Sequence, residues 1–379
     1  MKKIVHFIHG LNTGGAETLV KNYCLGLDKS KYDVTVLCYE RFDSPYDKIL
    51  FDAGIKVLYA CDRIKLWGRK DIAARVINHY QLYFVLRRML RELNPDILHT
   101  HLLVNKYVKF AGLSKNTRVF YTIHTQINKL WPVNLIGRNA DLSAAKWLVK
   151  KRGMRLITLY DGMKQEANEL FNVNNSVVLN NGVNFEAFEH AKGKGTMRAE
   201  LGIPQDAFVV GHVGRFSEVK NHRFLVDVFK EIYKRNDKAF LLMVGDGEDK
   251  ESIKSRLDEA SLNNHYLILS NRNDVADIMN AMDVFVFPSL YEGFGIVLVE
   301  AQKSGLPCFV SDAVPSTAKV TDLVRLLSLN NGAEFWAQAV HKYCQIKSEA
   351  IKSGKIDVPI DWDISNVIKR LEQIYDGVI

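Results

Sequence analysis

The hydrophobic positions of the chain fall into short apolar runs, separated by longer stretches in which apolar residues recur every three or four positions. Short, continuous apolar runs are typical of strands covered on both faces, and the longer periodic stretches are typical of amphipathic helices. The two patterns alternate, which predicts parallel sheets built from β-strand–helix–β-strand units. The strands expected are residues 3–9, 32–39, 55–60, 96–101, 119–125, 155–160 and 176–182 in the first half, and 208–215, 239–247, 266–271, 284–289 and 307–312 in the second.

One stretch interrupts this alternation. Residues 184–202 lose the strand pattern and gain glycine and charged residues, which is typical of a domain boundary. We therefore expect an α/β protein with two doubly wound, Rossmann-like domains, over residues 1–184 and 185–363; the 379 residues suffice for two hydrophobic cores. Residues 364–379 have apolar positions at helical spacing and predict an amphipathic helix that packs back on the first domain.

Composition excludes several classes of protein. The longest apolar run, residues 239–244, is far shorter than the ~18 residues of a membrane-spanning helix, so we expect no such helix. The N-terminus has two lysines like a signal peptide, but His6 and His9 interrupt its short apolar stretch, which fits a first strand better. The five cysteines include no Cys-x-x-Cys pair, which argues against a disulfide framework or a zinc site and favours the cytoplasm.

The net charge of +8 predicts an anionic partner, and nucleic acid, an anionic membrane and a phosphorylated ligand all fit the charge alone. Loops that follow strands are more informative, because ligands of open α/β sheets bind at the carboxyl ends of the strands. In the first loop, Gly14 and Gly15 precede a predicted helix, whose amides can approach an anion. A tight turn that uses glycine for positive φ is the alternative. The G-x-G-x-x-G pattern of nicotinamide-binding sites is absent from the sequence.

A second loop, residues 211–222, places Arg215 and Lys220 behind a strand that ends at Gly214. Arginine offers a planar fork to phosphate oxygens and lysine a compact charge, so the two can neutralise a diphosphate without a metal. The alternative is that both are solvated loop charges.

The third stretch, residues 288–307, contains Glu292 in a loop and Glu300 about two turns into a predicted helix. Two helical turns span roughly 9 Å along the axis at 1.5 Å per residue, so these carboxylates cannot act as a close pair and suit the two ends of an extended ligand. The alternative places Glu292 as a turn cap and Glu300 on a solvated helix face. Backbone amides at the start of the helix would also face a ligand; they belong to Gly293, Phe294 and Gly295.

Residues 289–312, SLYEGFGIVLVEAQKSGLPCFVSD, resemble the E-x7-E signature of retaining glycosyltransferases of family 4, which have the GT-B architecture. Other family landmarks follow in the same order along essentially the whole chain, namely GGAE, IHT with His124, NNGVN, GRFSEVK, VGDG and NRNDV. The SDAVPST segment is similar to bacterial enzymes that build capsular or exopolysaccharides. The resemblance implies two Rossmann-like domains that face each other across a cleft.

The resemblance also implies roles for single residues. Arg215 and Lys220 would hold the diphosphate of a nucleotide-sugar donor, Glu292 would approach the donor sugar, and His124 would lie beside the sugar being transferred. These four are the implied catalytic residues. The implied donor-binding residues are Glu300 at the ribose, Arg272 near the base, Gly14 and Gly15 at the phosphates, and the amides of Gly293, Phe294 and Gly295.

The implied activity is transfer of a sugar, with retention of configuration, from a UDP-sugar to a glycan or lipid-linked acceptor in bacterial surface polysaccharide biosynthesis. The nucleotide sugar is then substrate rather than cofactor, and nucleic acid is not a partner. The alternatives are a nucleotide-sugar epimerase of the same architecture and a non-catalytic nucleotide-binding subunit. The set of Arg215, Lys220, Glu292 and Glu300 argues against the second alternative.

This chain departs from the family pattern in places. It has Asn180-Asn181-Gly182 where Pro-Asn-Gly is common, and Thr125 where an Asp often follows the histidine. The Asp361-Trp362-Asp363 segment resembles a metal-binding motif, but GT-B enzymes of this type do not depend on a metal. We therefore interpret that segment as structural and expect no metal site.

A basic segment in the first half suggests a membrane contact. Residues 63–91, from Arg63 to Arg91, contain eight Lys or Arg and one acidic residue, Asp71. An apolar stripe at helical spacing predicts an amphipathic helix, which ordinarily packs on the sheet of its domain; it comprises Ile72, Val76, Tyr80, Tyr83, Leu86 and Leu90. Basic residues and Trp67 would also attract an anionic surface, so we expect peripheral docking on the inner membrane face if the acceptor is lipid-linked.

Overall fold

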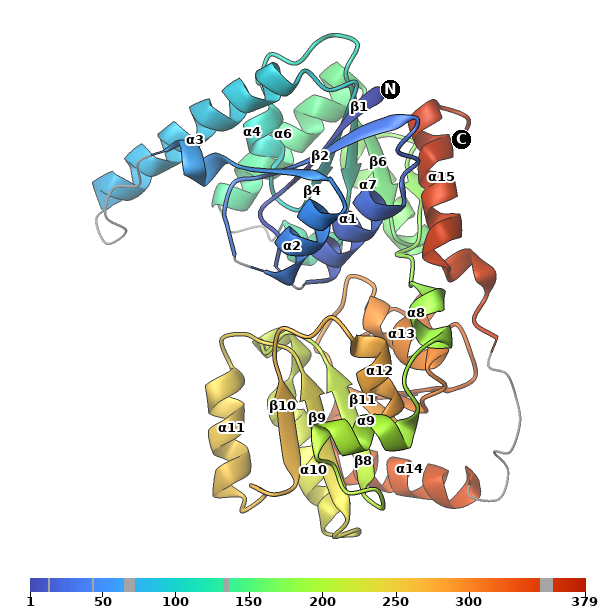
Figure 1. The fold of residues 1–379 in the computed structure, drawn as a ribbon. Coiled ribbons are helices and arrows are strands. Elements are labelled where there is room, and N and C mark those ends of the chain that lie inside the picture. The colour runs from blue at the N-terminus through green and yellow to red at the C-terminus, as the bar shows by residue number, and fades with distance from the viewer. Residues whose placement is uncertain (13, 43, 65–71, 132–135, 348–356) are drawn as a thin grey trace. The chain divides into compact units, whose positions relative to one another are not determined.

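The computed structural model describes residues 1–12, 14–42, 44–64, 72–131, 136–347 and 357–379 (Figure 1). The chain divides into two compact units. Unit 1 comprises Met1–Gly182 together with Ile364–Ile379, and unit 2 comprises Val183–Asp363. Each unit contains one sheet of parallel strands with helices around it, which confirms the predicted α/β class.

Within the described residues, unit 1 has a seven-stranded sheet in the order β3-β2-β1-β4-β5-β6-β7. Most of its strands are buried on both faces, which explains their continuous apolar pattern. The predicted strand at 176–182 is reduced to the two residues of β7, after which the amide of Leu179 still bonds to the carbonyl of Thr158 at 2.9 Å. The strands are β1 Lys2–Ile8, β2 Tyr32–Cys38, β3 Lys56–Tyr59, β4 Ile97–His101, β5 Arg118–Thr122, β6 Arg155–Thr158 and β7 Val177–Val178.

The helices of unit 1 connect and cover these strands. Helix α2 begins with a capping box, in which the Ser44 hydroxyl and the Asp47 carboxylate satisfy free amides of the first turn. Helix α7 ends at Asn172, which adopts the left-handed conformation that stops a helix. The helices are α1 Gly15–Gly26, α2 Pro45–Asp52, α3 Ile72–Leu93, α4 Asn105–Val108, α5 Ile127–Leu130, α6 Ile136–Arg152, α7 Asp161–Phe171 and α15 Ile364–Asp376.

The predicted inward stripe of α3 is only partly correct. Leu86 and Leu90 are buried, but Tyr80 is 60% exposed, because the first half of α3 extends away from the rest of unit 1 (Figure 1). The side chains of Ile72 and Val76 lie outside the described residues. In the described part of the chain, no helix is long and apolar enough to cross a membrane.

Helix α15 completes the core of unit 1 although it lies at the far end of the sequence. Its apolar residues belong to the same buried cluster as side chains of β1, β2 and α1, and Figure 1 shows the helix in red beside the other elements of unit 1. Gly26 of α1 leaves room for the approach of α15, because a Cβ there would lie 2.1 Å from Cδ1 of Ile368. The Tyr375 hydroxyl bonds to Nδ1 of His99 at 2.6 Å, which fixes the helix against the middle of the sheet.

Unit 2 has its own sheet, with six strands among the residues described, in the order β10-β9-β8-β11-β12-β13. Its strands are β8 Phe208–Val213, β9 Ala239–Val244, β10 Tyr266–Leu269, β11 Val284–Phe287, β12 Cys308–Ser311 and β13 Val324–Leu327. Its helices are α8 Phe185–Glu189, α9 Lys194–Leu201, α10 His222–Tyr233, α11 Lys250–Glu259, α12 Val275–Asn280, α13 Ile296–Lys303 and α14 Gly332–Lys347. The edge strand β13 is not apparent in the sequence, because only part of it is buried and Arg325 and Leu326 face solvent.

Both sheets have the topology that creates ligand sites in doubly wound proteins. In unit 1 the chain turns to opposite sides of β1, which lies between β2 and β4, and in unit 2 the same reversal occurs at β8, between β9 and β11. Ligands of open α/β sheets bind beyond the carboxyl ends of the strands at such a reversal. In unit 2 these ends carry the loops with Lys220 and Glu292.

A buried arginine fastens α9 to this sheet. Arg198 is 3% exposed, and its guanidinium donates to the carboxylate of Asp283 at 2.7 Å and to three backbone carbonyls at 2.9–3.0 Å. The same Asp283 oxygen accepts the amide of Val209 in β8 at 2.7 Å. Lys194 contacts the other oxygen from the solvent side.

We predict that Arg198→Met lowers the free energy of unfolding by ~3–5 kcal/mol, because it leaves buried carbonyls and part of a carboxylate without their donor. The matched control is Lys194→Met, which removes the exposed partner of the same carboxylate and should cost less than ~1 kcal/mol. Denaturant unfolding of both variants measures the difference. Losses of equal size would contradict the assigned role of Arg198.

Candidate active site

Two neighbouring strands of unit 2 bring the basic and acidic loops together. β8 and β11 pair in parallel, with Val210 opposite Val284 and Gly211 opposite Phe285, so their carboxyl ends lie side by side. The loop after β8 ends in a short 3-10 turn, Glu218–Lys220, and the loop after β11 leads to α13. A backbone hydrogen bond from the amide of Leu290 to the carbonyl of Val219, at 2.8 Å, joins the two loops.

Lys220 and Glu292 form the central contact of the site. Nζ of Lys220 lies 2.5 Å from Oε1 of Glu292, and the two side chains are only 18% and 11% exposed. The same ammonium lies 4.8 Å above the ring of Phe287, at the end of β11. The structure therefore brings together two residues that the sequence analysis assigned separately, one to a phosphate and one to a sugar.

Gly214 provides the space that this lysine needs. A Cβ at Gly214 would lie 3.3 Å from both Cδ and Cε of Lys220 and 3.1 Å from Nε2 of His212. His212 is fully buried, and its Nδ1 bonds to the carbonyl of Val286 in β11 at 2.8 Å. The glycine thus lets the lysine stem pack against the two paired strands.

Arg215 is held much more loosely than Lys220. Its guanidinium contacts the carboxylate of Glu248 at 3.1 and 3.3 Å, but the two side chains are 62% and 59% exposed. Exposed pairs of this kind contribute little free energy, so Arg215 can exchange Glu248 for another anion at low cost.

Two glycines after β9 support the Arg215 loop through backbone contacts. Gly245 and Gly247 both have φ of +152°, a conformation that side chains rarely allow. A Cβ at Gly245 would lie 2.0 Å from the carbonyl oxygen of Gly214, and one at Gly247 would lie 2.3 Å from that of Phe216. The amide of Phe216 bonds back to the carbonyl of Asp246 at 2.9 Å. The sequence analysis noted this Gly-Asp-Gly turn but not its supporting role.

The loop before α13 ends at Gly295, which has φ of +82° and is the N-cap of the helix. Phe294 is buried, and its ring stacks on that of Trp362 at 5.0 Å. The structure places Glu292 in this loop and the half-buried Glu300 within α13. The Trp362 contact gives the Asp361-Trp362-Asp363 segment a packing role inside unit 2.

One polar residue near this site was missed from the sequence. Ser289 follows β11 directly, and its buried hydroxyl has no hydrogen-bond partner in the described part of the structure. A buried hydroxyl is normally paired, so an unpaired one three residues before Glu292 marks a polar position that a ligand could use. The sequence did offer a signal for Ser289, because a serine that directly follows a buried strand lies at the carboxyl end of the sheet, where ligands bind.

Arg272 lies at another part of the same sheet. It follows β10, which β9 separates from β8, and its guanidinium pairs with Asp274 through Nε at 2.7 Å and through Nη2. This pair raises the pKa of Arg272 above its usual value, chiefly because the charged guanidinium donates hydrogen bonds to the Asp274 carboxylate. The structure gives no contact between Arg272 and the Lys220–Glu292 pair.

The remaining predicted residues lie in unit 1. Gly14 is the N-cap of α1 with φ of −93°, which any residue can adopt, so the tight-turn alternative with positive φ is wrong at this position. A Cβ there would lie 2.3 Å from Oε2 of Glu17, the far end of a flexible side chain, which would have to move aside. Gly15 is the first residue of α1.

His124 lies two residues beyond the end of β5. Its Nε2 bonds to Nδ1 of His101 at 3.0 Å, while its own Nδ1 is buried and has no partner among the described residues. Burial lowers the pKa of His124 to about 3, so the ring is neutral near pH 7. The sequence analysis missed His101, although its position at the end of a strand beside His124's strand was a signal.

Comparisons with known proteins identify the family of the chain. Two family models match: "Glycosyltransferase Family 4" over residues 13–187 and "Glycosyl transferases group 1" over residues 193–344. A putative glycosyltransferase of Bacillus subtilis, EpsF, is 30% identical over 357 residues, which cover 89% of this chain and 87% of EpsF. The chain belongs to this glycosyltransferase family. It is therefore an enzyme of the transferase class.

Other glycosyltransferases support the same assignment. The Escherichia coli UDP-Gal:alpha-D-GlcNAc-diphosphoundecaprenol alpha-1,3-galactosyltransferase is 30% identical over 371 residues, covering 92% of this chain and 89% of that protein. The crystal structure of Anabaena HepE in complex with UDP-glucose superimposes with a TM-score of 0.78 over 100% of both chains, at 17% identity. At that identity the likeness concerns the fold alone, and it confirms the GT-B fold predicted from the sequence.

We predict that Gly245→Ala lowers the free energy of unfolding by at least ~2 kcal/mol, because a side chain there combines a strained backbone with a clash against Gly214. The control is Gly332→Ala, which has φ of +75° but no atom within 4 Å of the added Cβ. This control should cost only ~1 kcal/mol. Denaturant unfolding measures both, and equal losses would show that the contact with the Arg215 loop is unimportant.

Proposed function

We propose that this glycosyltransferase moves a hexose, with retention of configuration, from a UDP-sugar to a glycan or lipid-linked acceptor in the assembly of a bacterial surface polysaccharide. The observation that carries the proposal is the Lys220–Glu292 pair at the carboxyl ends of β8 and β11, next to the exposed Arg215. The printed names of relatives support the substrate classes: a UDP-galactose-dependent enzyme acting on a diphosphoundecaprenol acceptor, and the Staphylococcus aureus capsular glycosyltransferase CapM.

The proposed chemistry is stabilisation of charge on the leaving group. As the bond between the sugar and the diphosphate breaks, its electrons pass to the departing phosphate oxygen, and cations already in place stabilise this charge more than the ground state. Lys220 and Arg215 supply these cations in place of a divalent metal. The acceptor hydroxyl forms the new bond on the same face of the sugar, and its proton passes to the departing phosphate.

The Lys220–Glu292 contact explains how the donor could be held. The ammonium has three N–H donors, so it can keep the Glu292 carboxylate and also bind a phosphate oxygen. Glu292 would then face the sugar, and the amides of Gly293–Gly295 would line the phosphate and sugar. In the same proposal Glu300 binds the ribose, Arg272 lies near the base, Gly14 and Gly15 approach the phosphates, and His124 lies beside the sugar.

A donor screen followed by product analysis tests this function. A ligand at 100 times its dissociation constant stabilises the protein by about 2.7 kcal/mol, so the correct nucleotide sugar should raise Tm clearly. The stabilising donor is then incubated alone, with acceptor, and with acceptor plus EDTA. We expect a retained glycoside only when acceptor is present, and undiminished by EDTA. An epimerised sugar without acceptor would indicate an epimerase, and activity restored only by magnesium or manganese would contradict the metal-free mechanism.

Peripheral docking on the inner face of the membrane is part of the proposal. The described part of α3 exposes Ile77, Tyr80 and Phe84, with exposed fractions of 41%, 60% and 61%. Trp67, Arg69 and Lys70 lie outside the described residues, as does the side chain of Arg75.

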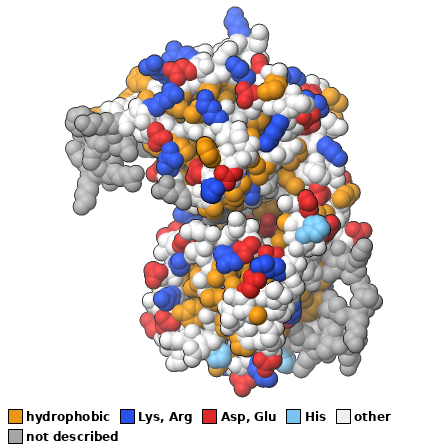
Figure 2. All heavy atoms as spheres, in the orientation of Figure 1, with side chains coloured by type: hydrophobic (Ala, Val, Ile, Leu, Met, Phe, Trp, Pro, Cys, Tyr) orange, Lys and Arg blue, Asp and Glu red, His pale blue; other side chains and the backbone are white. Residues whose placement is uncertain are grey.

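Nucleic acid is not a partner in this proposal. Figure 2 shows Lys and Arg interspersed with Asp and Glu on the visible face, which does not form the continuous basic surface typical of nucleic-acid binding.

We predict that Lys220→Ala and Arg215→Ala each lower kcat about a hundredfold or more, because each removes a charge contact made in the transition state and worth ~3 kcal/mol. Steady-state kinetics measures the change. The control is Lys234→Ala, which removes an exposed lysine that pairs with Glu231 in the same unit. Near-normal turnover in both variants, with Tm unchanged, would contradict the phosphate assignment.

We predict that Glu300→Gln weakens donor binding more than it slows the chemical step, since a ribose contact holds substrate and transition state alike. KM for the donor should therefore rise while kcat changes little. Calorimetric titration with UDP measures the dissociation constant of the nucleotide separately from kcat. A fall in kcat with unchanged donor affinity would rule out the ribose role.

We predict that the protein sediments with anionic vesicles, that salt weakens this binding, and that changing Arg69, Lys70 and Arg75 to Glu reduces it, because each basic residue near such a surface contributes about 1 kcal/mol. Tyr80→Ser combined with Phe84→Ser should also reduce binding. Phe51→Ser is the control, since Phe51 on α2 is 79% exposed but lies outside the basic segment. Equal binding to neutral vesicles, or none at low salt, would mean that the enzyme acts away from membranes.

A further inference from the structure

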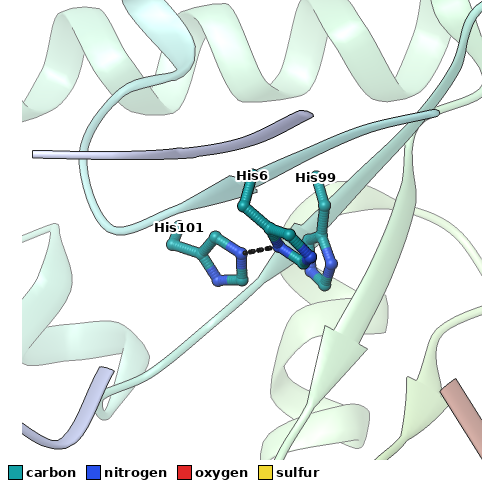
Figure 3. A group of neighbouring side chains, drawn as sticks. All are labelled: His6, His99 and His101. Carbon is teal, nitrogen blue, oxygen red and sulfur yellow. Dashed lines mark hydrogen bonds between the residues drawn. The ribbon is translucent and has the colours of Figure 1, made fainter. Parts of the chain in front are cut away.

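Four histidines lie together among the central strands of unit 1. His6 comes from β1, His99 and His101 come from β4, and His124 follows β5; three of them are shown in Figure 3. The parallel register places His6 directly opposite His99. His6, His99 and His101 are all 0% exposed. Histidines at this depth must be hydrogen-bonded or carry a large cost in free energy.

Hydrogen bonds link three of these rings into a chain. Nδ1 of His6 lies 3.0 Å from Nε2 of His101, as Figure 3 shows by a dashed line. Nδ1 of His101 lies 3.0 Å from Nε2 of His124. Burial lowers the pKa of His6 and His124 to about 3 and that of His101 well below its usual value. Each ring is therefore neutral near pH 7 and has one N–H donor and one acceptor nitrogen.

His99 lies beside this chain but is not part of it. Its ring centroid is 4.2 Å from that of His101, yet its nitrogens bond to the hydroxyls of Tyr375 at 2.6 Å and Thr122 at 2.7 Å. Nitrogens of His6, His99 and His101 come within 4.8 Å of one another, which is a spacing that a metal ion could use. Hydrogen bonds already occupy both nitrogens of His99 and of His101, so a metal would have to break several of them.

The hydrogen bonds that link His6, His101 and His124 can run in only two directions. Because each neutral ring has a single N–H, either all three rings carry it on Nδ1 or all three carry it on Nε2. The two end atoms, Nε2 of His6 and Nδ1 of His124, both lack a hydrogen-bond partner among the described residues. In the first direction the unpaired donor belongs to His124, and in the second it belongs to His6.

The surroundings of the two ends favour the first direction. His6 lies in the middle of β1 and is fully buried, so an unpaired N–H there would stay unsatisfied. His124 lies in the loop beyond β5 and is partly exposed as a residue, so although its Nδ1 is covered in this structure, a small shift of the ring would bring that nitrogen to a ligand oxygen. An unpaired buried donor costs roughly 1–3 kcal/mol, and only the first direction lets a ligand remove that cost.

We propose that His6 and His101 are positioning residues that fix His124 as an Nδ1–H donor, so that His124 donates a hydrogen bond to a hydroxyl oxygen of the bound sugar. The ring then cannot act as a general base through Nδ1. The location of the proton follows from contacts inside unit 1, while the identity of the acceptor oxygen rests on the proposed function.

Nitrogen NMR of the full-length protein with ¹⁵N-labelled histidine tests the direction without any substrate. Protonated and bare ring nitrogens resonate in separate ranges, and comparison with His124→Gln assigns the signals of His124. We expect His124 to be protonated on Nδ1 in the native protein. A proton on Nε2 of His124 would overturn the proposal, whether or not the protein transfers sugar.

Substitutions test whether the hydrogen bonds through His6 and His101, rather than the packing of the rings, set the proton position on His124. His6→Phe removes the donor to His101 and should cause loss of the Nδ1–H signal of His124, together with a higher KM for the sugar donor. His99→Phe is the matched control, because it changes a neighbouring ring of the same strands and removes two hydrogen bonds outside the chain. The control should leave the His124 signal unchanged. A retained signal in His6→Phe, or equal loss in His99→Phe, would contradict the proposal.

Metal analysis tests the alternative explanation, that His6, His99 and His101 bind a metal ion. The native protein is dialysed against Zn²⁺ and its metal content is measured, and we expect no stoichiometric uptake at the histidines. Stoichiometric zinc that His6→Phe abolishes would overturn the hydrogen-bonded chain.

Discussion

The ion pair between Lys220 and Glu292 is the contact on which the candidate active site depends. Both side chains are nearly buried, and each requires the other, because a single buried charge without a partner would be strongly destabilising. The pair exists only because β8 and β11 are adjacent and parallel, although their loops are 72 residues apart in the chain. The hydrogen bond between Leu290 and Val219 and the space at Gly214 maintain that arrangement.

The two cations at this site are held in opposite ways. Lys220 lies between a carboxylate and an aromatic ring, whereas Arg215 is exposed and weakly paired. A site for a charged, mobile substrate benefits from both, since preorganised charge stabilises the transition state and a mobile side chain can follow the ligand. The backbone beneath Arg215 is nevertheless fixed by Gly245 and Gly247.

The core of unit 1 contains buried polar side chains at the centre of its sheet. His99 connects β4 to the C-terminal helix through Tyr375, and His101 connects β1 to the loop that carries His124. Such networks are costly unless every member is paired, so they fix one arrangement of the strands. Residues from the two ends of the sequence, His6 and Tyr375, therefore both contact the histidines of β4.

The sequence alone determined the α/β class, most strands and the loops that carry Arg215, Lys220, Glu292 and Glu300. These features are local, because a continuous apolar run indicates a strand covered on both faces whatever its neighbours are. Tertiary structure decided which strands are adjacent, and hence the Lys220–Glu292 contact, the separate position of Arg272 and the links among His6, His101 and His124. It also decided that Tyr80 is exposed and that Gly245 is needed for space beside Gly214, because burial and close approach depend on atoms far away in the chain.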